Sequence, residues 1–177
     1  LSIRRQRQMC IRDRYGDLLP FNYQYEQSAV IYRILAQADT QYSSWLHENG
    51  YLLHERKRFK LFCYSPFIFE KVRPLPEAGC LKIIGERAVW YISFIPEKST
   101  LEFIQGIFAH QSFSIGNKKY QVAFDVVGVE AISMPQLTEQ MAFQAMSPIC
   151  VKLHEDNKTQ YLSPDNPMFA DGILKGL

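Results

Sequence analysis

Two helix-patterned stretches follow each other closely near the start of the chain and constrain its fold more than any other feature. In the first, Asn22 can cap a helix whose apolar stripe consists of Val30, Ile31, Ile34, Leu35 and Ala38. Asp39 can cap a second helix, which ends at Gly50 and whose expected buried stripe consists of Tyr42, Trp45 and Leu46. The spacing therefore predicts two helices joined into a hairpin.

Strand-like segments dominate the chain after this hairpin. They lie at 61–64, 81–84, 88–95, 120–132, 149–153 and 160–162. The second and third are expected to pair as a hairpin that turns near Gly85, and Pro96 opens a further helix. Helices, then strands, then a helix on the sheet indicate the α+β class, of which a ferredoxin-like (RRM-like) plait is the simplest member.

The first fourteen residues differ in charge from the rest of the chain. They contain five arginines and one aspartate, a charge of +4, whereas the remaining residues carry −2 and the whole chain +2. A basic arm of this kind can bind nucleic acid or an anionic membrane. The string RRQRQMCIRDR instead closely resembles translated sequencing-adapter sequence, and we therefore exclude residues 1–14 from the expected fold.

The chain is expected to have three parts. They are a non-native, adapter-derived extension at 1–14, an N-terminal ferredoxin-like domain at 15–135, and at 136–177 the beginning of a second, truncated ferredoxin-like domain. A plait begins with a strand, and the residues ahead of Asp17 that should form it are those expected to be foreign. A central strand is therefore expected to be missing or replaced.

Composition and motifs exclude several classes of protein. No apolar run approaches the roughly twenty residues that span a bilayer, and reduced thiols in a cytoplasmic protein are the default. Neither a zinc site nor a disulfide framework is expected, because the four cysteines are isolated at Cys10, Cys63, Cys80 and Cys150. The sequence has no Gly-rich phosphate loop, nucleophile elbow or zinc-protease helix. Any catalysis is therefore expected to be acid–base chemistry without metal or cofactor.

Three side chains are candidates for that chemistry, and each also has a purely structural interpretation. His47 faces away from the buried stripe of its own helix, by about 150° at about 100° per residue, and is either a surface histidine or an accessible acid–base group. Tyr32 borders the first apolar stripe and is either packing or, across a helical hairpin, a neighbour of His47. Lys60 closes the basic run and is either a solvated cation or a phosphate-binding group.

A basic run precedes the first strand. It is interleaved with Phe59 and Phe62 and consists of Arg56, Lys57, Arg58 and Lys60. Basic groups hold phosphates and aromatic faces stack on bases, so this run is the candidate RNA-binding segment.

Several collinear motifs run from about Gly16 to Gly172. They are Leu19-Pro20-Phe21-Asn22-Tyr23, Ile31-Tyr32, Trp45-Leu46-His47-Glu48, Phe59-Lys60-Leu61-Phe62, Tyr64-Ser65, Gly116-Asn117, Met146-Ser147-Pro148-Ile149 and Tyr161-Leu162-Ser163-Pro164. Together they resemble the Cas-six-type CRISPR-associated endoribonucleases, RNA-processing enzymes built from two ferredoxin-like halves. The glycine-rich loop of the family's C-terminal half does not follow Gly172.

By this resemblance the family's catalytic tyrosine, histidine and lysine correspond to Tyr32, His47 and Lys60. The family cuts precursor CRISPR RNA within its repeats, without metal, and leaves a 2′,3′-cyclic phosphate and a 5′-hydroxyl. For a 2′-hydroxyl attack, His47 would be the general acid or base, Lys60 would stabilise the phosphorane-like transition state, and Tyr32 would orient or donate to the scissile phosphate. Whether His47 or Tyr32 is the base stays open here.

The resemblance also implies partners. They are the repeat stretch of precursor CRISPR RNA, other subunits of a CRISPR effector complex and a second copy of the chain in a homodimer, with no membrane. Two rival functions are a non-catalytic subunit that binds repeat RNA and a structural module of a larger ribonucleoprotein. The three candidate residues favour the enzyme over both.

Overall fold

The computed structural model describes residues 5–52, 58–132, 136, 138–142, 144–155 and 158–176. For residues 5–15, 154, 155, 175 and 176 the description is of the backbone. The chain forms two compact units, Leu1–Thr138 and Glu139–Leu177. The division into ferredoxin-like domains at 15–135 and 136–177 stays a prediction.

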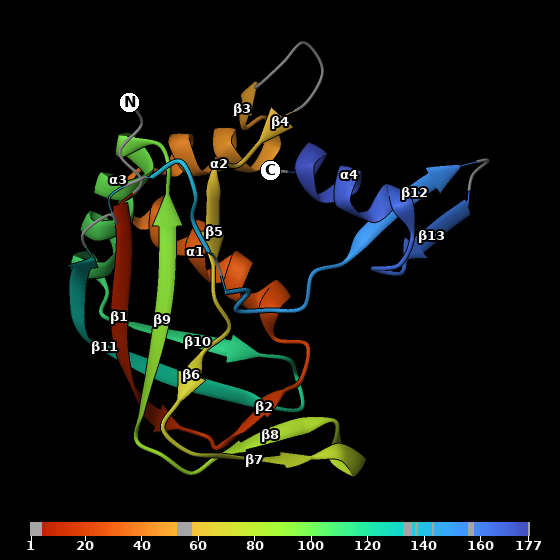
Figure 1. Ribbon diagram of the computed structural model, residues 1–177. Coiled ribbons are helices and arrows are strands. Elements are labelled where there is room, and N and C mark those ends of the chain that lie inside the picture. The colour runs from red at the N-terminus through yellow and green to blue at the C-terminus, as the bar shows by residue number, and fades with distance from the viewer. Residues whose placement is uncertain are drawn as a thin grey trace. The chain divides into compact units, whose positions relative to one another are not determined.

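The first unit is a plait of strands and helices (Figure 1). Its principal elements, in chain order, are β1 (Arg5–Tyr15), α1 (Gln24–Ala38), β5 (Phe62–Tyr64), β9 (Arg87–Phe94), α3 (Glu97–Ala109) and β11 (Gln121–Ile132). The strands are antiparallel neighbours in the order β11-β1-β9-β5, while β10 (Ser112–Gly116) extends one edge and β6 (Ile68–Phe69) also pairs with β9. This β-α-β-β-α-β arrangement is ferredoxin-like, and the predicted fold is confirmed.

The central strand of this sheet is formed by the adapter-like segment. The register of β1 pairs Arg7 with Ile92 of β9 on one side and with Ala131 of β11 on the other. The position of the plait's first strand is thus filled by residues that the sequence pattern excluded from the fold. That residues 1–14 are foreign to the protein stays a prediction.

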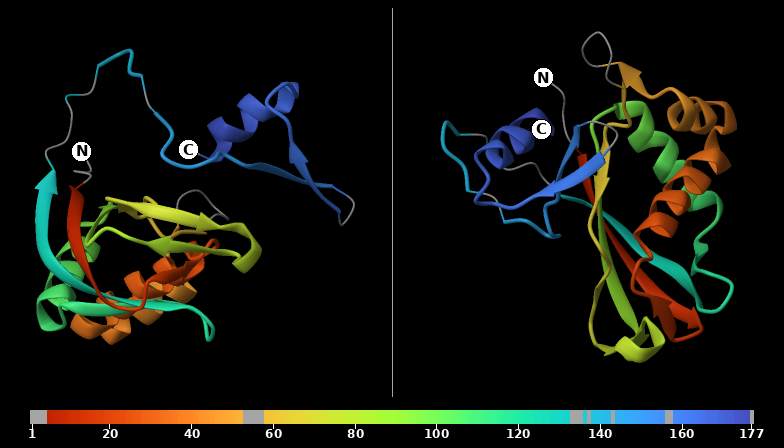
Figure 2. Two further views of the ribbon diagram at one scale, coloured as in Figure 1. Left: turned by 90° about the horizontal axis from the view of Figure 1, so that it is seen from below. Right: turned by 90° about the vertical axis from the view of Figure 1, so that its right-hand side faces the viewer.

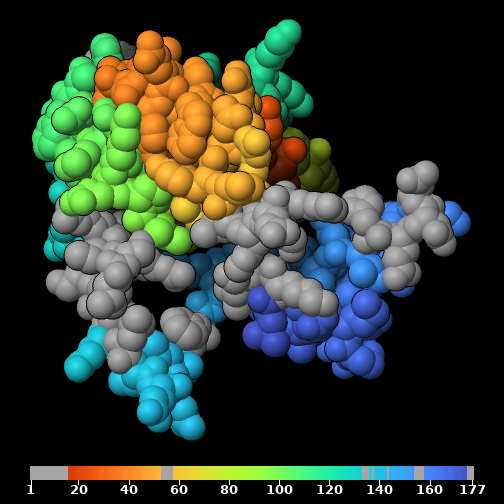
Figure 3. Space-filling model, turned by 90° about the horizontal axis from the view of Figure 1, so that it is seen from above, coloured from red at the N-terminus to blue at the C-terminus, as the bar shows by residue number. Residues whose placement is uncertain are grey.

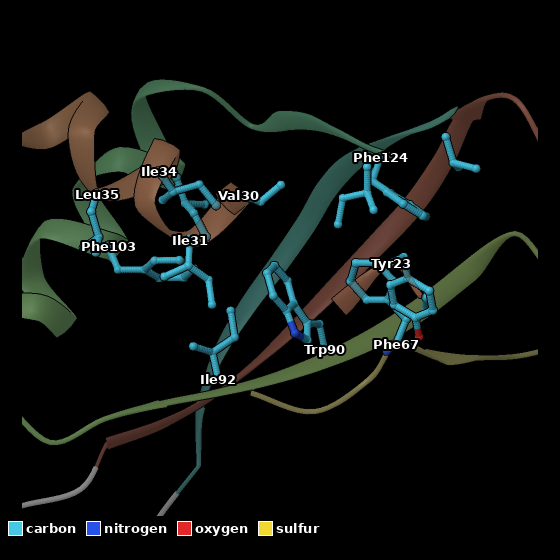
Figure 4. Packing of buried hydrophobic residues seen from close by; sticks show 14 of the residues in the cluster. Tyr23, Val30, Ile31, Ile34, Leu35, Phe67, Trp90, Ile92, Phe103 and Phe124 are labelled. Carbon is cyan, nitrogen blue, oxygen red and sulfur yellow. Dashed lines mark hydrogen bonds between the residues drawn. The ribbon is translucent and has the colours of Figure 1, made fainter. Parts of the chain in front are cut away.

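The helices cover one face of the sheet (Figure 2). Their layer consists of α1, α3 and the nine-residue α2 (Thr40–Glu48). Four residues of the stripe predicted for α1, Val30, Ile31, Ile34 and Leu35, are buried, whereas Ala38 is only partly buried. The buried residues pack against aromatic residues of the sheet and of α3 (Figure 4). No helix within the described ranges is long and apolar enough to cross a membrane.

The predicted hairpin over 81–84 and 88–95 is wrong. β8 (Cys80–Ile83) pairs instead with β2 (Leu18–Pro20) and β7 (Val72–Leu75) in a second sheet, next to the short helix η1 (Pro76–Ala78). The amides of Ile84 and Gly85 donate to the carbonyl of Lys71, at 2.9 and 3.0 Å, where the chain passes from one sheet to the other. Two apolar runs beside a turn resemble a hairpin locally, but both edges of β9 are taken by more distant strands.

The remaining strands form two small hairpins. β3 (Tyr51–Leu52) pairs with β4 (Arg58–Phe59) directly after α2. In the second unit β12 (Val151–Glu155) pairs with β13 (Lys158–Leu162), and α4 (Pro167–Gly176) follows. Gly172 of α4 lies so close to Val151 of β12 that a Cβ on the glycine would overlap its side chain.

Close packing of α1 on α3 depends on one glycine. Gly106 is buried in α3, and a Cβ there would overlap the backbone carbonyl of Ile34 in α1. Overpacking of this kind forces backbone shifts. The two helices can therefore cross at this distance only with glycine at position 106.

We expect Gly106→Ala to lower the free energy of unfolding by about 2–3 kcal/mol, because the helices must move apart. Urea unfolding followed by circular dichroism measures this change. Gly128→Ala is the matched control, since a Cβ at Gly128 meets nothing within 4 Å, and its effect should stay within about 0.5 kcal/mol. Equal effects of the two variants would contradict the packing argument.

Candidate functional site

The two N-terminal helices are joined by polar contacts that the sequence places at their junction. Asp39 ends α1 and caps α2, where its Oδ1 accepts from the amide of Tyr42 at 2.8 Å. One turn further along, Ser43 Oγ donates to the carbonyl of Tyr32 at 2.8 Å. These bonds fix α2 against α1, and α2 lies at the surface beside α3 (Figure 3).

This arrangement brings Tyr32 and His47 together. Their ring centroids lie 4.9 Å apart with the planes at 82°, an edge-to-face contact. Phe62 of β5 packs on Tyr32 in a similar way, with centroids 5.6 Å apart. Tyr32 is half-buried and His47 is exposed, so that the imidazole is open to solvent.

Lys60 lies at the C-terminal end of α2. Its ammonium donates to the carbonyl of Leu46 at 2.7 Å and to the carbonyl of His47. Gly50 makes this approach possible: its φ is +68°, and a Cβ would lie 2.7 Å from the carbonyl oxygen of Phe59. The structure thus gathers Tyr32, His47 and Lys60 around the last turn of α2.

The basic run is described at only two of its residues. Arg56 and Lys57 lie outside the described residues. Arg58 is exposed on β4 and donates from Nη1 to Oδ1 of Asn49 at 2.9 Å, close to the same end of α2. Of the predicted RNA-binding residues, Arg58 is therefore the one placed next to the site.

The environment of Tyr32 disfavours its ionised form. Burial raises the pKa of the Tyr32 phenol above its ordinary value of 10.0, and the nearby Tyr64 phenol raises it further. Tyr32 therefore keeps its proton throughout the neutral range. The phenol can donate a hydrogen bond but is poorly suited to remove a proton from a ribose hydroxyl.

Trp45 differs from the expected buried stripe of α2. Tyr42 and Leu46 are buried as predicted, but Trp45 is 39% exposed. It stacks on Tyr42, with centroids 5.9 Å apart, and packs edge-on against Tyr51, at 5.0 Å. Among the residues that the structure describes, no element covers the exposed side of the indole, because α2 is short and lies at the rim of the helical layer.

Ser43 was missed by the sequence pattern. It precedes His47 by four residues, the spacing at which two side chains share a helix face. A small polar residue on the face that carries the candidate histidine was therefore the available signal.

No cluster of three or more His, Cys, Asp or Glu side chains that could hold a metal ion occurs among the residues that the structure describes.

Comparison with known proteins places the chain in a family. Residues 18–125, more than half of the chain, match the family model described as CRISPR-associated protein Cas6, N-terminal. A CRISPR-associated endoribonuclease Cas6 of Methanocaldococcus jannaschii is 26% identical over 164 residues, which cover 90% of this chain and 59% of that protein. The chain spans about three fifths of the length of the curated relatives that it matches, 59–62%.

Solved structures share the fold. The product of a Cas6-related gene from Pyrococcus furiosus superposes with a TM-score of 0.78 at 23% identity, over 97% of this chain and 67% of that one. An RAMP protein described as binding different RNA substrates superposes with a TM-score of 0.75 at 24% identity, over 97% and 68%. The chain belongs to the CRISPR-associated Cas6 family, and its match is to the N-terminal part of that family.

Proposed function

We propose that the protein is an endoribonuclease that cuts precursor CRISPR RNA within its repeats, without a metal ion. The observation that carries this proposal is the exposed imidazole of His47, 4.9 Å from the ring of Tyr32 and beside the Lys60 ammonium at the end of α2. The name of the Methanocaldococcus relative, an endoribonuclease, supports the activity. The RNA-binding RAMP neighbour supports RNA as the substrate class.

The proposed reaction is a transesterification. The ribose 2′-hydroxyl loses its proton to a general base and attacks the adjacent phosphorus. The bond to the 5′-oxygen then breaks as that oxygen gains a proton, leaving a 2′,3′-cyclic phosphate and a 5′-hydroxyl. No oxidant or other co-reactant is needed, so two proton-transfer groups and one cation are enough.

The surroundings of the three side chains suggest how these tasks are divided. His47 is exposed and serves as the base, whereas Tyr32, whose pKa is raised by burial, keeps its proton and donates to the phosphate or the leaving oxygen. Lys60 stabilises the additional negative charge of the transition state. Arg58, with Arg56 and Lys57, binds flanking phosphates.

Replacement of His47 tests its role directly. In the full-length protein with EDTA present, we expect His47→Ala to slow single-turnover cleavage of cognate repeat RNA by about 10²- to 10⁴-fold, because proton transfer is lost. The affinity of this variant for the RNA should change by no more than about threefold, because His47 is a single contact among many. His110→Ala is the matched control, since His110 is also exposed but ends α3.

Two outcomes of the same assay would count against the proposal. Cleavage by His47→Ala at the wild-type rate would remove His47 from the mechanism. Binding of cognate repeats by the wild type without any cutting would favour the non-catalytic RNA-binding subunit.

A second test changes the RNA rather than the protein, by removing the attacking 2′-hydroxyl. A repeat RNA with a single 2′-deoxynucleotide on the 5′ side of the scissile phosphate should bind normally and stay intact, because it lacks the nucleophile. Gel analysis of the end-labelled RNA measures both properties. A deoxynucleotide one position away is the control, and cutting of the first RNA would indicate attack by water.

The donor role of Tyr32 predicts an alkaline titration. The phenol should lose its proton at a higher pH than 10.0 in the folded chain, and Phe62→Ala should lower this pKa by admitting water to the ring. The ¹³Cζ resonance of labelled tyrosine, assigned with Tyr32→Phe, follows the titration. The pKa of Tyr32 is higher in the folded chain than in the unfolded chain, so the protonated phenol contributes to the free energy of unfolding. This contribution is complete below about pH 10 and is lost as the pH rises through the raised pKa. A Tyr32 that ionises below pH 10.0 would contradict the argument from burial, and one that ionises in the neutral range would contradict the donor role.

A further inference from the structure

The C-terminal end of α2 is held by a side chain from another segment. The last four carbonyls of a helix have no amide partners within the helix. In α2 the carbonyl of Trp45 accepts from the amides of Asn49 and Gly50, at 2.8 and 3.2 Å. The next two carbonyls, those of Leu46 and His47, accept from the Lys60 ammonium.

We propose that Lys60 is a positioning residue for His47, because its ammonium fixes the backbone carbonyls of the helical turn that carries the imidazole. The inference rests on the proposed function in one respect: the proposed function gives the reason why that imidazole has to be held in place. A lysine ammonium has three N–H donors, and two of them account for these carbonyls. The role is therefore compatible with a contact between the same ammonium and a phosphate oxygen.

The backbone around Lys60 is shaped for this contact. Leu61, the next residue, has a φ of 56°, in the left-handed region that is unfavourable for leucine. Its carbonyl accepts from the amide of Ile95 at 2.9 Å, which ties this turn to the end of β9. A strained residue persists where its surroundings fix it, and such residues cluster at functional sites.

One short segment consequently contacts both helices of the site. Lys60 binds the end of α2, and Phe62, two residues later, packs on Tyr32 of α1. The turn at Leu61 sets the spacing between these two contacts. Loss of the Lys60 contact should therefore release the last turn of α2 while leaving Tyr32 in place, and the edge-to-face contact between Tyr32 and His47 should be lost.

Hydrogen exchange in the RNA-free chain tests the positioning role. In Lys60→Met, the amides of Asn49 and Gly50 should exchange about 10- to 100-fold faster, because the last turn of α2 frays without its charge-assisted bonds. The Hε1 resonance of His47 should also move toward that of a free histidine, as the ring leaves the face of Tyr32. Lys60→Arg, which keeps the charge and the donors, should restore part of both properties.

Lys98→Met is the matched control. Lys98 binds the opposite end of the same helix, through an ion pair of 3.2 Å with Asp39. Its replacement should leave the exchange at Asn49 and Gly50 and the His47 resonance unchanged. If Lys60→Met does not fold, Lys60→Gln carries the test with an intermediate increase in exchange.

The outcomes separate this proposal from the proposed function. Wild-type exchange and an unmoved His47 resonance in a folded Lys60→Met or Lys60→Gln variant would overturn the positioning role, even if cleavage were slowed. If the wild type cuts no repeat RNA but Lys60→Met shows the expected changes, the positioning role is supported and the proposed activity is ruled out. The expected changes together with slowed cleavage would support both.

Discussion

The packing of α1 on the sheet is the interaction on which the rest of the first unit depends. Most of its apolar face is buried, with Ile31 and Leu35 at 0% exposure, and Gly106 of α3 lets the two helices approach closely. Because α1 is fixed in this way, the Asp39 cap and the bond from Ser43 to the carbonyl of Tyr32 fix α2 as well. The candidate site is thus supported by the hydrophobic core through two polar contacts.

The helices were predictable from the sequence, whereas the strand pairing was not. A stripe such as Val30, Ile31, Ile34 and Leu35 is a local signal that tertiary packing reinforces. The partner of β9 depends on residues far away in the chain, and the register pairs Arg5 with the buried Phe94. Such long-range pairing leaves no pattern in the local sequence.

Some of the residues at the candidate site were predictable from the sequence. Helical spacing allowed Tyr32 and His47 to converge, and the family resemblance added Lys60. The contact of Lys60 with the end of α2 was not predictable, because it requires a left-handed leucine at position 61 and a glycine at position 50 that admits the strand. Patterns of apolar residues carry no information on such backbone conformations, whereas Asn49-Gly50 at least indicates a helix end.

The position of the site at a helix C-terminus has an electrostatic consequence. Phosphates usually bind at helix N-termini, where amide groups and the positive end of the macrodipole attract them. The C-terminal end of α2 presents carbonyl oxygens, which would repel an RNA phosphate. The Lys60 ammonium covers two of these carbonyls, and Arg58 binds the adjacent Asn49, so positive charge replaces negative charge at this end. Under the proposed function, the lysine that caps the helix would therefore also make the same place suitable for a phosphodiester, and neutral residues at position 60 would lose both effects together.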